Sequence, residues 1–245
     1  MKTFALFFCL AISGFAQGTK SSPSSAPSEK IDPVALIKEI LGTPPKTPRE
    51  MMGVLKIRTA DADPREVPIK WMIRPFEGQW QDIYQTPDTG SIPQEILTVV
   101  HRVGMTNHYD FKRAGQPVAE VATNVFIPFA TSDFWVGDFG LEFLHWPNPK
   151  HVKTEMRHSR PCYVIETINP HPEKGGYARV LSWIDTEYGG LIRADGYTRD
   201  GKLLKEFQIR EFKRVEGRWE LKAVTISNDQ TDSNTRLEFN LELKD

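Results

Sequence analysis

The chain has 245 residues, a formal net charge of −1 at pH 7 and 26% charged residues. Because it has no excess of Lys and Arg with which to neutralise phosphates, its composition argues against nucleic acid as a partner and against binding to an anionic membrane surface. Of its two cysteines, Cys9 lies in the signal peptide predicted below, so Cys162 has no partner for an internal disulfide and a hydrophobic core must hold the fold together. A chain of this length can bury such a core as one large domain.

Residues 1–16 have the pattern of a secretory signal peptide. Lys2 precedes an apolar run and then small residues, and we place cleavage after Ala16. The run is too short to span a membrane, which takes about 20 apolar residues, and Cys9 lacks the small residues that precede an acylated cysteine. Cys162 then remains alone, and we expect it to be a buried small hydrophobe. These features predict a periplasmic protein, with secretion as the second choice.

Residues 17–30 are rich in Ser and Pro and almost free of apolar side chains, which predicts a flexible linker. A short helix follows. Asp32 is its expected N-cap, Pro33 occupies its first turn, and Gly42 is expected to close it in a left-handed cap. We expect residues 31–245 to form a single domain.

From residue 52 onward the period of the apolar residues changes from 3.6 to 2, which predicts strands. About a dozen are expected, nearly all joined by short hairpins, with turn signals at Gly115, Asp200-Gly201 and Glu216-Gly217. A sheet of this length curls. We predict a mainly β fold with few helices (α+β), in which a large curled antiparallel sheet forms an incomplete β-barrel with a helical lid. The face expected to be apolar carries Leu181, Trp183, Phe207, Ile209, Trp219, Leu221, Val224, Leu237, Phe239 and Leu241.

The stretch "PFATSDFWVGDFGLEFLHWP", residues 128–147, lies between two blocks of predicted strands and holds six aromatic residues. It is not a membrane span, because Asp133, Asp138 and Glu142 would each cost about 3 kcal/mol near the centre of one. We expect these carboxylates at the N-terminus of a helix and on its wet side.

In the same stretch, aromatic residues recur at helical spacing after Ser132, a suitable N-cap. Gly137 and Gly140 each weaken a helix by about 1 kcal/mol relative to Ala. We predict a short, glycine-loosened helix that is apolar on more than one side. It could be a plug or flap for the barrel mouth, or a plain core helix, which is the more usual origin of an aromatic stripe. The residues predicted to line the cavity and lid are Phe129, Phe134, Trp135, Phe139, Leu141, Phe143, Trp146, Trp71 and Trp183.

The order of a helix, a curled sheet, the "SDF…GDF" segment and the later run "CYVIETINP…YARVLSWID…LIRADGYTRDGKLLKEF" resembles the outer-membrane lipoprotein-sorting protein family (LolA-like periplasmic carriers) over about residues 31–245. The resemblance implies an incomplete barrel with a helical lid, whose apolar inner surface holds lipoprotein acyl chains. It also implies an inner-membrane extractor and an outer-membrane receptor as partners. An Arg-Pro pair in these carriers ends an early strand, where the Arg controls lid closure. Arg74 and Pro75 match that pair, so the resemblance assigns lid control to Arg74.

The sequence lacks the common catalytic motifs GxSxG, HExxH, GxxxxGK[ST] and GxGxxG. His145, His151 and His158 have spacings that fit no common zinc site, so we expect them on the surface or in turns. We therefore expect no enzymatic activity, cofactor or metal. An enzyme would need a polar constellation inside the barrel.

Two functions remain open. A carrier of lipoprotein acyl chains or another lipid predicts a dry, elongated apolar cavity. A non-enzymatic structural or interaction module of a cell-envelope complex predicts a filled barrel and an exposed apolar patch.

Overall fold

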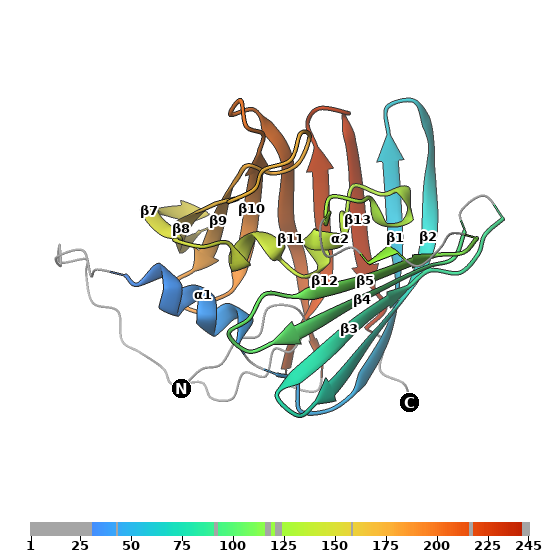
Figure 1. Cartoon of the computed structure of the whole chain (residues 1–245), viewed down its shortest axis with the longest axis horizontal. Helices are drawn as coiled ribbons and strands as arrows, with labels where there is room; N and C mark the ends of the chain where they lie inside the picture. Colours follow the sequence, from blue (N-terminus) through green and yellow to red (C-terminus); the bar gives the residue numbers. More distant parts are fainter. Residues whose placement is uncertain are drawn as a thin grey trace.

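The computed structural model describes residues 31–42, 44–90, 93–115, 119–120, 124–157, 159–215 and 218–241 (Figure 1). The predicted signal peptide and linker and the Glu216-Gly217 turn lie outside the described residues. In the described ranges, no helix is both long and apolar enough to cross a membrane.

Helix α1 (Pro33–Leu41) begins as predicted. The Asp32 carboxylate accepts hydrogen bonds from the backbone N–H groups of the second and third helical residues, at 2.9 and 3.3 Å. Ile37 and Ile40 are buried, so α1 packs one apolar side on the rest of the molecule. The predicted left-handed cap is wrong: Gly42 has φ −98°. Two prolines follow closely and end the helix without that cap.

The strands carry the period-2 pattern that predicted them, and the turn glycines Gly115 and Gly201 have φ of +78° and +80°, a conformation that side chains disfavour. The strands are β1 (Arg49–Thr59), β2 (Ala62–Phe76), β3 (Gln79–Gln85), β4 (Glu95–Arg102), β5 (His108–Arg113), β6 (Ala119–Glu120), β7 (Lys150–Arg157), β8 (Arg160–Ile168), β9 (Arg179–Asp185), β10 (Leu191–Tyr197), β11 (Leu203–Val215), β12 (Arg218–Asn228) and β13 (Ser233–Phe239).

These 13 strands form one sheet in the order β6-β5-β4-β3-β2-β1-β13-β12-β11-β10-β9-β8-β7. It consists of two antiparallel meanders, β1 to β6 and β7 to β13. They join in the middle of the sheet, where β1 pairs antiparallel with β13 and Leu55 lies opposite Leu237. The two halves curl toward each other without closing, and β6 and β7 are the free edges (Figure 1). The predicted incomplete antiparallel barrel is confirmed.

The concave face of the curled sheet holds the main core. Of the side chains predicted to be inward, Phe207, Ile209, Leu221, Val224, Leu237, Phe239 and Leu241 belong to it. The side chain of Trp219 lies outside the described part. The prediction of an inward position is wrong for Leu181 and Trp183, because they belong to a separate cluster. Both sides of β9 are apolar, since Val180 and Ile184 lie in the main core, so the period of 2 could not identify the inward face.

Candidate functional site

Residues 124–149, called the plug below, cross the concave face from the β6 edge to the β7 edge (Figure 1). The continuous helix predicted here is wrong. Ala130, Thr131 and Leu141 have φ near +50°, a left-handed conformation that interrupts a right-handed helix. The plug instead contains three helical turns, η1 (Phe129–Thr131), α2 (Val136–Phe139) and η2 (Glu142–His145).

The two plug glycines serve close packing. A Cβ on Gly137 would lie 2.9 Å from the Val125 side chain, and a Cβ on Gly140 would lie 2.3 Å from the Tyr109 hydroxyl. Any larger residue at either position would push the plug away from its neighbours. The prediction that these glycines loosen a helix is therefore wrong. They allow the plug to pack closely against its neighbours.

The predicted lid residues come together on the concave face. The Phe139 ring lies at their centre, with ring centroids 4.5 Å from Tyr84, 5.1 Å from Phe129 and 5.4 Å from Phe134. Trp71 of β2 stacks on Tyr84 at 6.1 Å and 7°. Each predicted plug residue is at most 9% exposed: Phe129, Phe134, Trp135, Phe139, Leu141, Phe143 and Trp146.

Plug side chains thus occupy the place where a carrier was expected to have an elongated cavity. Beneath Phe126, Trp135 and Tyr177 the remaining space is about 10 Å³, roughly the room that one water needs. Around these described residues the concave face is filled by the protein itself, which is what the structural module predicts and not the open cavity that a carrier predicts.

Buried polar contacts also fasten the plug to the sheet. Asp133, only 8% exposed, accepts hydrogen bonds from the hydroxyls of Ser233 and Thr235 of β13, at 2.5 and 2.8 Å. Its backbone N–H donates to the Thr235 hydroxyl at 3.0 Å, and its carbonyl accepts a hydrogen bond from the Lys205 ammonium at 2.6 Å. A carboxylate expected on the wet side of a helix is instead the anchor of the plug.

Lys205 of β11 is the buried cation of this interface. It is 2% exposed, and its Nζ lies 3.2 Å from the centroid of the Trp135 ring. Burial lowers the pKa of Lys205 to about 7, while Asp138 and Asp133 oppose the shift. Asp138 accepts hydrogen bonds from the Trp135 backbone N–H at 2.7 Å and from the Tyr177 hydroxyl at 3.1 Å, and burial raises its pKa.

A second carboxylate, Glu95 of β4, fixes the start of the plug. It is 1% exposed and accepts the backbone N–H of Ala130 at 2.6 Å, while Arg113 pairs with its other oxygen at 2.7 Å. Arg65 of β2 donates to the Thr131 carbonyl at 2.7 Å. Within the described residues, Arg65 rather than Arg74 contacts the plug.

Arg74 does not occupy the place that lid control requires. It is exposed, and the alternation along β2 puts it on the convex face, opposite to the inward Ile73. The assignment carried over from the Arg-Pro pair is therefore corrected.

The far end of the plug has a third polar group. The Tyr109 hydroxyl donates to Glu142 at 2.9 Å, and the Asn107 side chain donates to the Gly140 carbonyl at 2.7 Å. Burial raises the pKa of Glu142 to about 7. Burial also lowers the pKa of His145 to about 4, with His101 adding to the shift. His145 is half-buried in the helical turn η2, so it lies in a turn, one of the two places predicted for it.

The other two histidines of the sequence cluster give different outcomes. His151 is partly exposed and lies 3.1 Å from the Thr154 hydroxyl, whereas His158 lies outside the described residues. No group of three or more His, Cys, Asp or Glu side chains in the described ranges is arranged to hold a metal ion.

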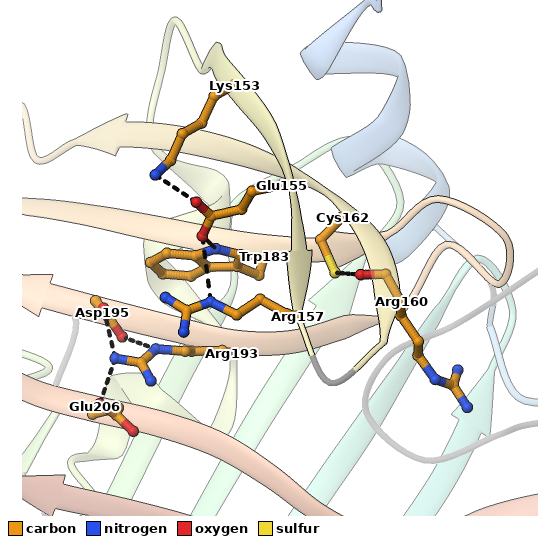
Figure 2. Close-up of polar contacts among 9 residues, drawn as sticks. All are labelled: Lys153, Glu155, Arg157, Arg160, Cys162, Trp183, Arg193, Asp195 and Glu206. Carbon is orange, nitrogen blue, oxygen red and sulfur yellow. Dashed lines mark hydrogen bonds and ion pairs between the residues drawn. The ribbon is translucent and has the colours of Figure 1, made fainter. Parts of the chain in front are cut away.

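Trp183 lies on the convex face under a charged cover (Figure 2). The guanidinium groups of Arg157 and Arg193 lie 4.9 and 5.4 Å from its ring centroid, and its indole N–H donates to Glu155 at 2.5 Å. Cys162 belongs to the same small cluster and is fully buried, as predicted. Trp183 consequently does not line the concave face.

Comparisons with known proteins extend these observations. A family model described only as an uncharacterized protein matches residues 122–243. A search of curated proteins found no match. A DUF1329 family protein from Desulfovibrio piger is 14% identical with a TM-score of 0.69, over 85% of this chain and 90% of its own. A putative outer membrane lipoprotein-sorting protein domain from Vibrio parahaemolyticus is 17% identical with a TM-score of 0.63, over 80% and 87%.

A LolA superfamily protein from Nitrosomonas europaea is 14% identical with a TM-score of 0.60, over 87% of this chain and 92% of its own. The chain has a LolA-like fold. Identities this low show the shared fold alone, so the LolA-like fold tells where to look for a site and leaves its chemistry to this chain's own residues.

Within this LolA-like fold, sequence reasoning found the aromatic residues of the plug and missed the polar residues that hold it. Lys205 did carry a signal, because it precedes the inward Phe207 and Ile209 at the same period of 2. A lysine at an inward position of an apolar strand needs a buried partner. Ser233 and Thr235 gave no comparable signal, since short hydroxyl residues are ordinary in strands and turns.

Proposed function

We propose that this protein is a non-enzymatic carrier that binds the acyl chains of a lipid or lipoprotein on the concave face of its half-barrel after the plug has moved away. The observation that carries the proposal is that one segment, which connects the two edge strands of the sheet, packs its aromatic side chains into the apolar core on the concave face. The LolA-like fold supports it, since one similar structure is described as a putative lipoprotein-sorting domain.

The free energy lost when the plug leaves the core is comparable to the free energy gained when an acyl chain takes its place. The seven plug residues that the sequence predicted for the cavity and lid are among its buried apolar side chains and contribute about 1.5–3 kcal/mol each, so on the order of 10–20 kcal/mol is lost when these seven leave the core. Each methylene of an acyl chain recovers roughly 0.8 kcal/mol, so one long chain recovers about 12 kcal/mol and two recover more. Long or paired chains therefore displace the plug, and short chains do not.

The polar contacts suit a plug that closes reversibly. Hydroxyl, carboxylate and ammonium groups at this interface can exchange their partners for water, which an all-apolar interface cannot do. Lys205 and Glu142 also have pKa values of about 7, so small changes in their surroundings change their charge. These contacts hold the plug against the sheet, and because they are noncovalent the plug can separate from the sheet without breaking a covalent bond.

The proposal includes the cellular setting that the sequence predicts. Export by residues 1–16 places the carrier in the periplasm, and an inner-membrane extractor and an outer-membrane receptor are its proposed protein partners. No catalytic step, cofactor or metal has a part in it.

The filled concave face favours a second candidate, a structural or interaction module of an envelope complex. In that case the plug never leaves, and a partner binds elsewhere. Apolar side chains on the outside would then make the contact: Val34, Phe76, Val103 and Met105 are each at least 45% exposed.

A reversible covalent latch separates the two candidates. Asp133→Cys with Thr235→Cys replaces the anchor pair, whose side chains meet at 2.8 Å, by a disulfide that joins plug and sheet. Cys162, the cysteine that remains after the predicted cleavage, is fully buried and does not compete. We expect the reduced protein to take up a fluorescent hexadecanoyl lipid, and the oxidised protein to take up none.

The same protein in its two redox states is its own control. Equal uptake by both states would show that lipid does not need the plug to move. The absence of uptake by wild type and by the reduced protein, together with an empty protein in native mass spectrometry after mild purification, would favour the structural module.

A further inference from the structure

A groove of about 450 Å³ lies outside the concave face, between α1, the turn that follows β4 and the end of the plug. Figure 1 shows α1 beside the connection between β4 and β5. Its volume falls in the range of small-ligand sites, about 300–1,000 Å³. None of the plug contacts described above fills this groove.

The groove has an apolar floor and an apolar rim. Its floor includes Ile37 of α1, Trp80 of β3, and Leu144 and Trp146 of the plug, all of them buried. On the rim, Val34 and Met105 are each 57% exposed. Two large apolar side chains held in water beside an apolar floor lose that exposure when a chain-like apolar ligand lies between them.

The charges along the groove have one sign. Lys38 and Arg102 line it and are exposed, and no Asp or Glu is among the described residues that line it. Arg102 is held in place by the Gln79 side chain, which accepts its Nε–H at 3.2 Å. His101 also lines the groove but is buried, with its Nε2 2.8 Å from the Asp82 carboxylate, so Lys38 and Arg102 are the exposed cations among the described lining residues.

We propose that this groove binds one acyl chain of an anionic amphiphile, with the chain on the floor and its carboxylate or phosphate between Lys38 and Arg102. The inference rests on the proposed carrier function and gives it an outer site that is filled while the plug is closed. Leu144 and Trp146 belong to both the groove and the plug, so a ligand here touches the segment that must later move.

The test uses a short fluorescent fatty acid, dansyl-undecanoic acid, and the full mature chain carrying the Asp133→Cys and Thr235→Cys latch in its oxidised state. We expect binding to persist, because the groove does not require plug movement. Lys38→Glu combined with Arg102→Glu should weaken it by about tenfold or more, since two charge-assisted contacts become repulsive. Lys202→Glu, a matched charge reversal at a remote turn where the side chain is 75% exposed, should change it less than about twofold.

Two further ligands identify the headgroup. The methyl ester of the probe should bind weakly, and a lysophospholipid with an anionic phosphate should compete if phosphate serves as well as carboxylate. Lack of competition would restrict the site to fatty acids, with the Lys38 and Arg102 contact intact.

The outcomes distinguish this inference from the proposed function. If the short probe binds the reduced protein but not the oxidised one, the proposed groove site is wrong and the proposed carrier function is unaffected. Binding that survives oxidation but ignores Lys38→Glu and Arg102→Glu would also overturn the groove. Short-chain binding to the latched protein without long-chain uptake by the reduced one would support the groove and overturn the carrier.

Discussion

Two tryptophans of this protein each lie against cations, on opposite faces of the same sheet. Under the plug, the single ammonium of Lys205 lies 3.2 Å from the Trp135 ring centroid and is out of water. On the convex face, the guanidinium groups of Arg157 and Arg193 lie against the Trp183 ring and pair with the carboxylates of Glu155 and Asp195 (Figure 2). Both contacts rest on the attraction between a cation and an aromatic ring, but the two kinds of cation differ in how readily they lose their charge.

An arginine keeps its charge at any ordinary pH, so the convex contact is permanent. A buried lysine loses its proton readily, so the contact under the plug is conditional. The comparison teaches that the cation–aromatic contact on the convex face keeps its charge, whereas the one under the plug can lose its charge near neutral pH. Four predictions test it.

Phe139→Ala should have the largest effect. Removing the ring at the centre of the plug leaves a cavity against Tyr84, and large-to-small changes of this kind cost about 3–5 kcal/mol of unfolding free energy. Urea denaturation measures the loss. Phe212→Ala, at a side chain that is 40% exposed, is the control and should cost far less. Similar costs for both would mean that the plug is not part of the core.

Lys205→Met tests the conditional charge directly. A pKa lowered to about 7 in the folded state means that the unfolded state binds the extra proton between pH 7 and pH 10. Wild-type stability should therefore rise with pH in that window, by about 2–3 kcal/mol from pH 7 to pH 9, and Lys205→Met should remove the rise. Arg157→Met should leave it unchanged. A rise that persists in Lys205→Met would assign it to another group.

Glu142→Gln and His145→Gln should have opposite effects between pH 4 and pH 7. The raised pKa of Glu142 stabilises the fold at low pH, and this contribution is lost as pH rises toward 7. The lowered pKa of His145 stabilises the fold at higher pH, and this contribution is lost as pH falls toward 4. Each variant should change the stability difference across the window by about 2 kcal/mol, in opposite directions. Parallel slopes would contradict this assignment.

Arg157→Met should have the smallest effect. A partly exposed cation over an aromatic ring contributes about 0.5–1 kcal/mol, and the methionine stem still covers Trp183. The Tm should fall by only a few degrees, and the tryptophan fluorescence of the variant should report a modestly more exposed indole. A loss as large as that of Phe139→Ala would show that the convex cover is structural in its own right.

Sequence reasoning predicted what local chemistry determines. Asp32 and Pro33 start α1 because capping needs only neighbouring residues, and the strands follow from alternation. It misplaced Trp183 because both faces of β9 are apolar, and it missed the three turns of the plug because the left-handed residues Ala130 and Leu141 have no local signature. Those features are determined by tertiary packing across the concave face, which no single segment contains.

The same dependence on distant residues applies to the seam between β1 and β13. Each meander consists of hairpins that form from nearby residues, but the seam pairs Gly53 with Phe239 across nearly the whole described chain. Folding that depends on such non-local contacts is slow. Until β1 and β13 pair, each has an edge of unpaired backbone groups to which a second unfolded chain can add. Aggregation therefore competes with folding at two strands that lie in the middle of the finished sheet, rather than at its edge strands.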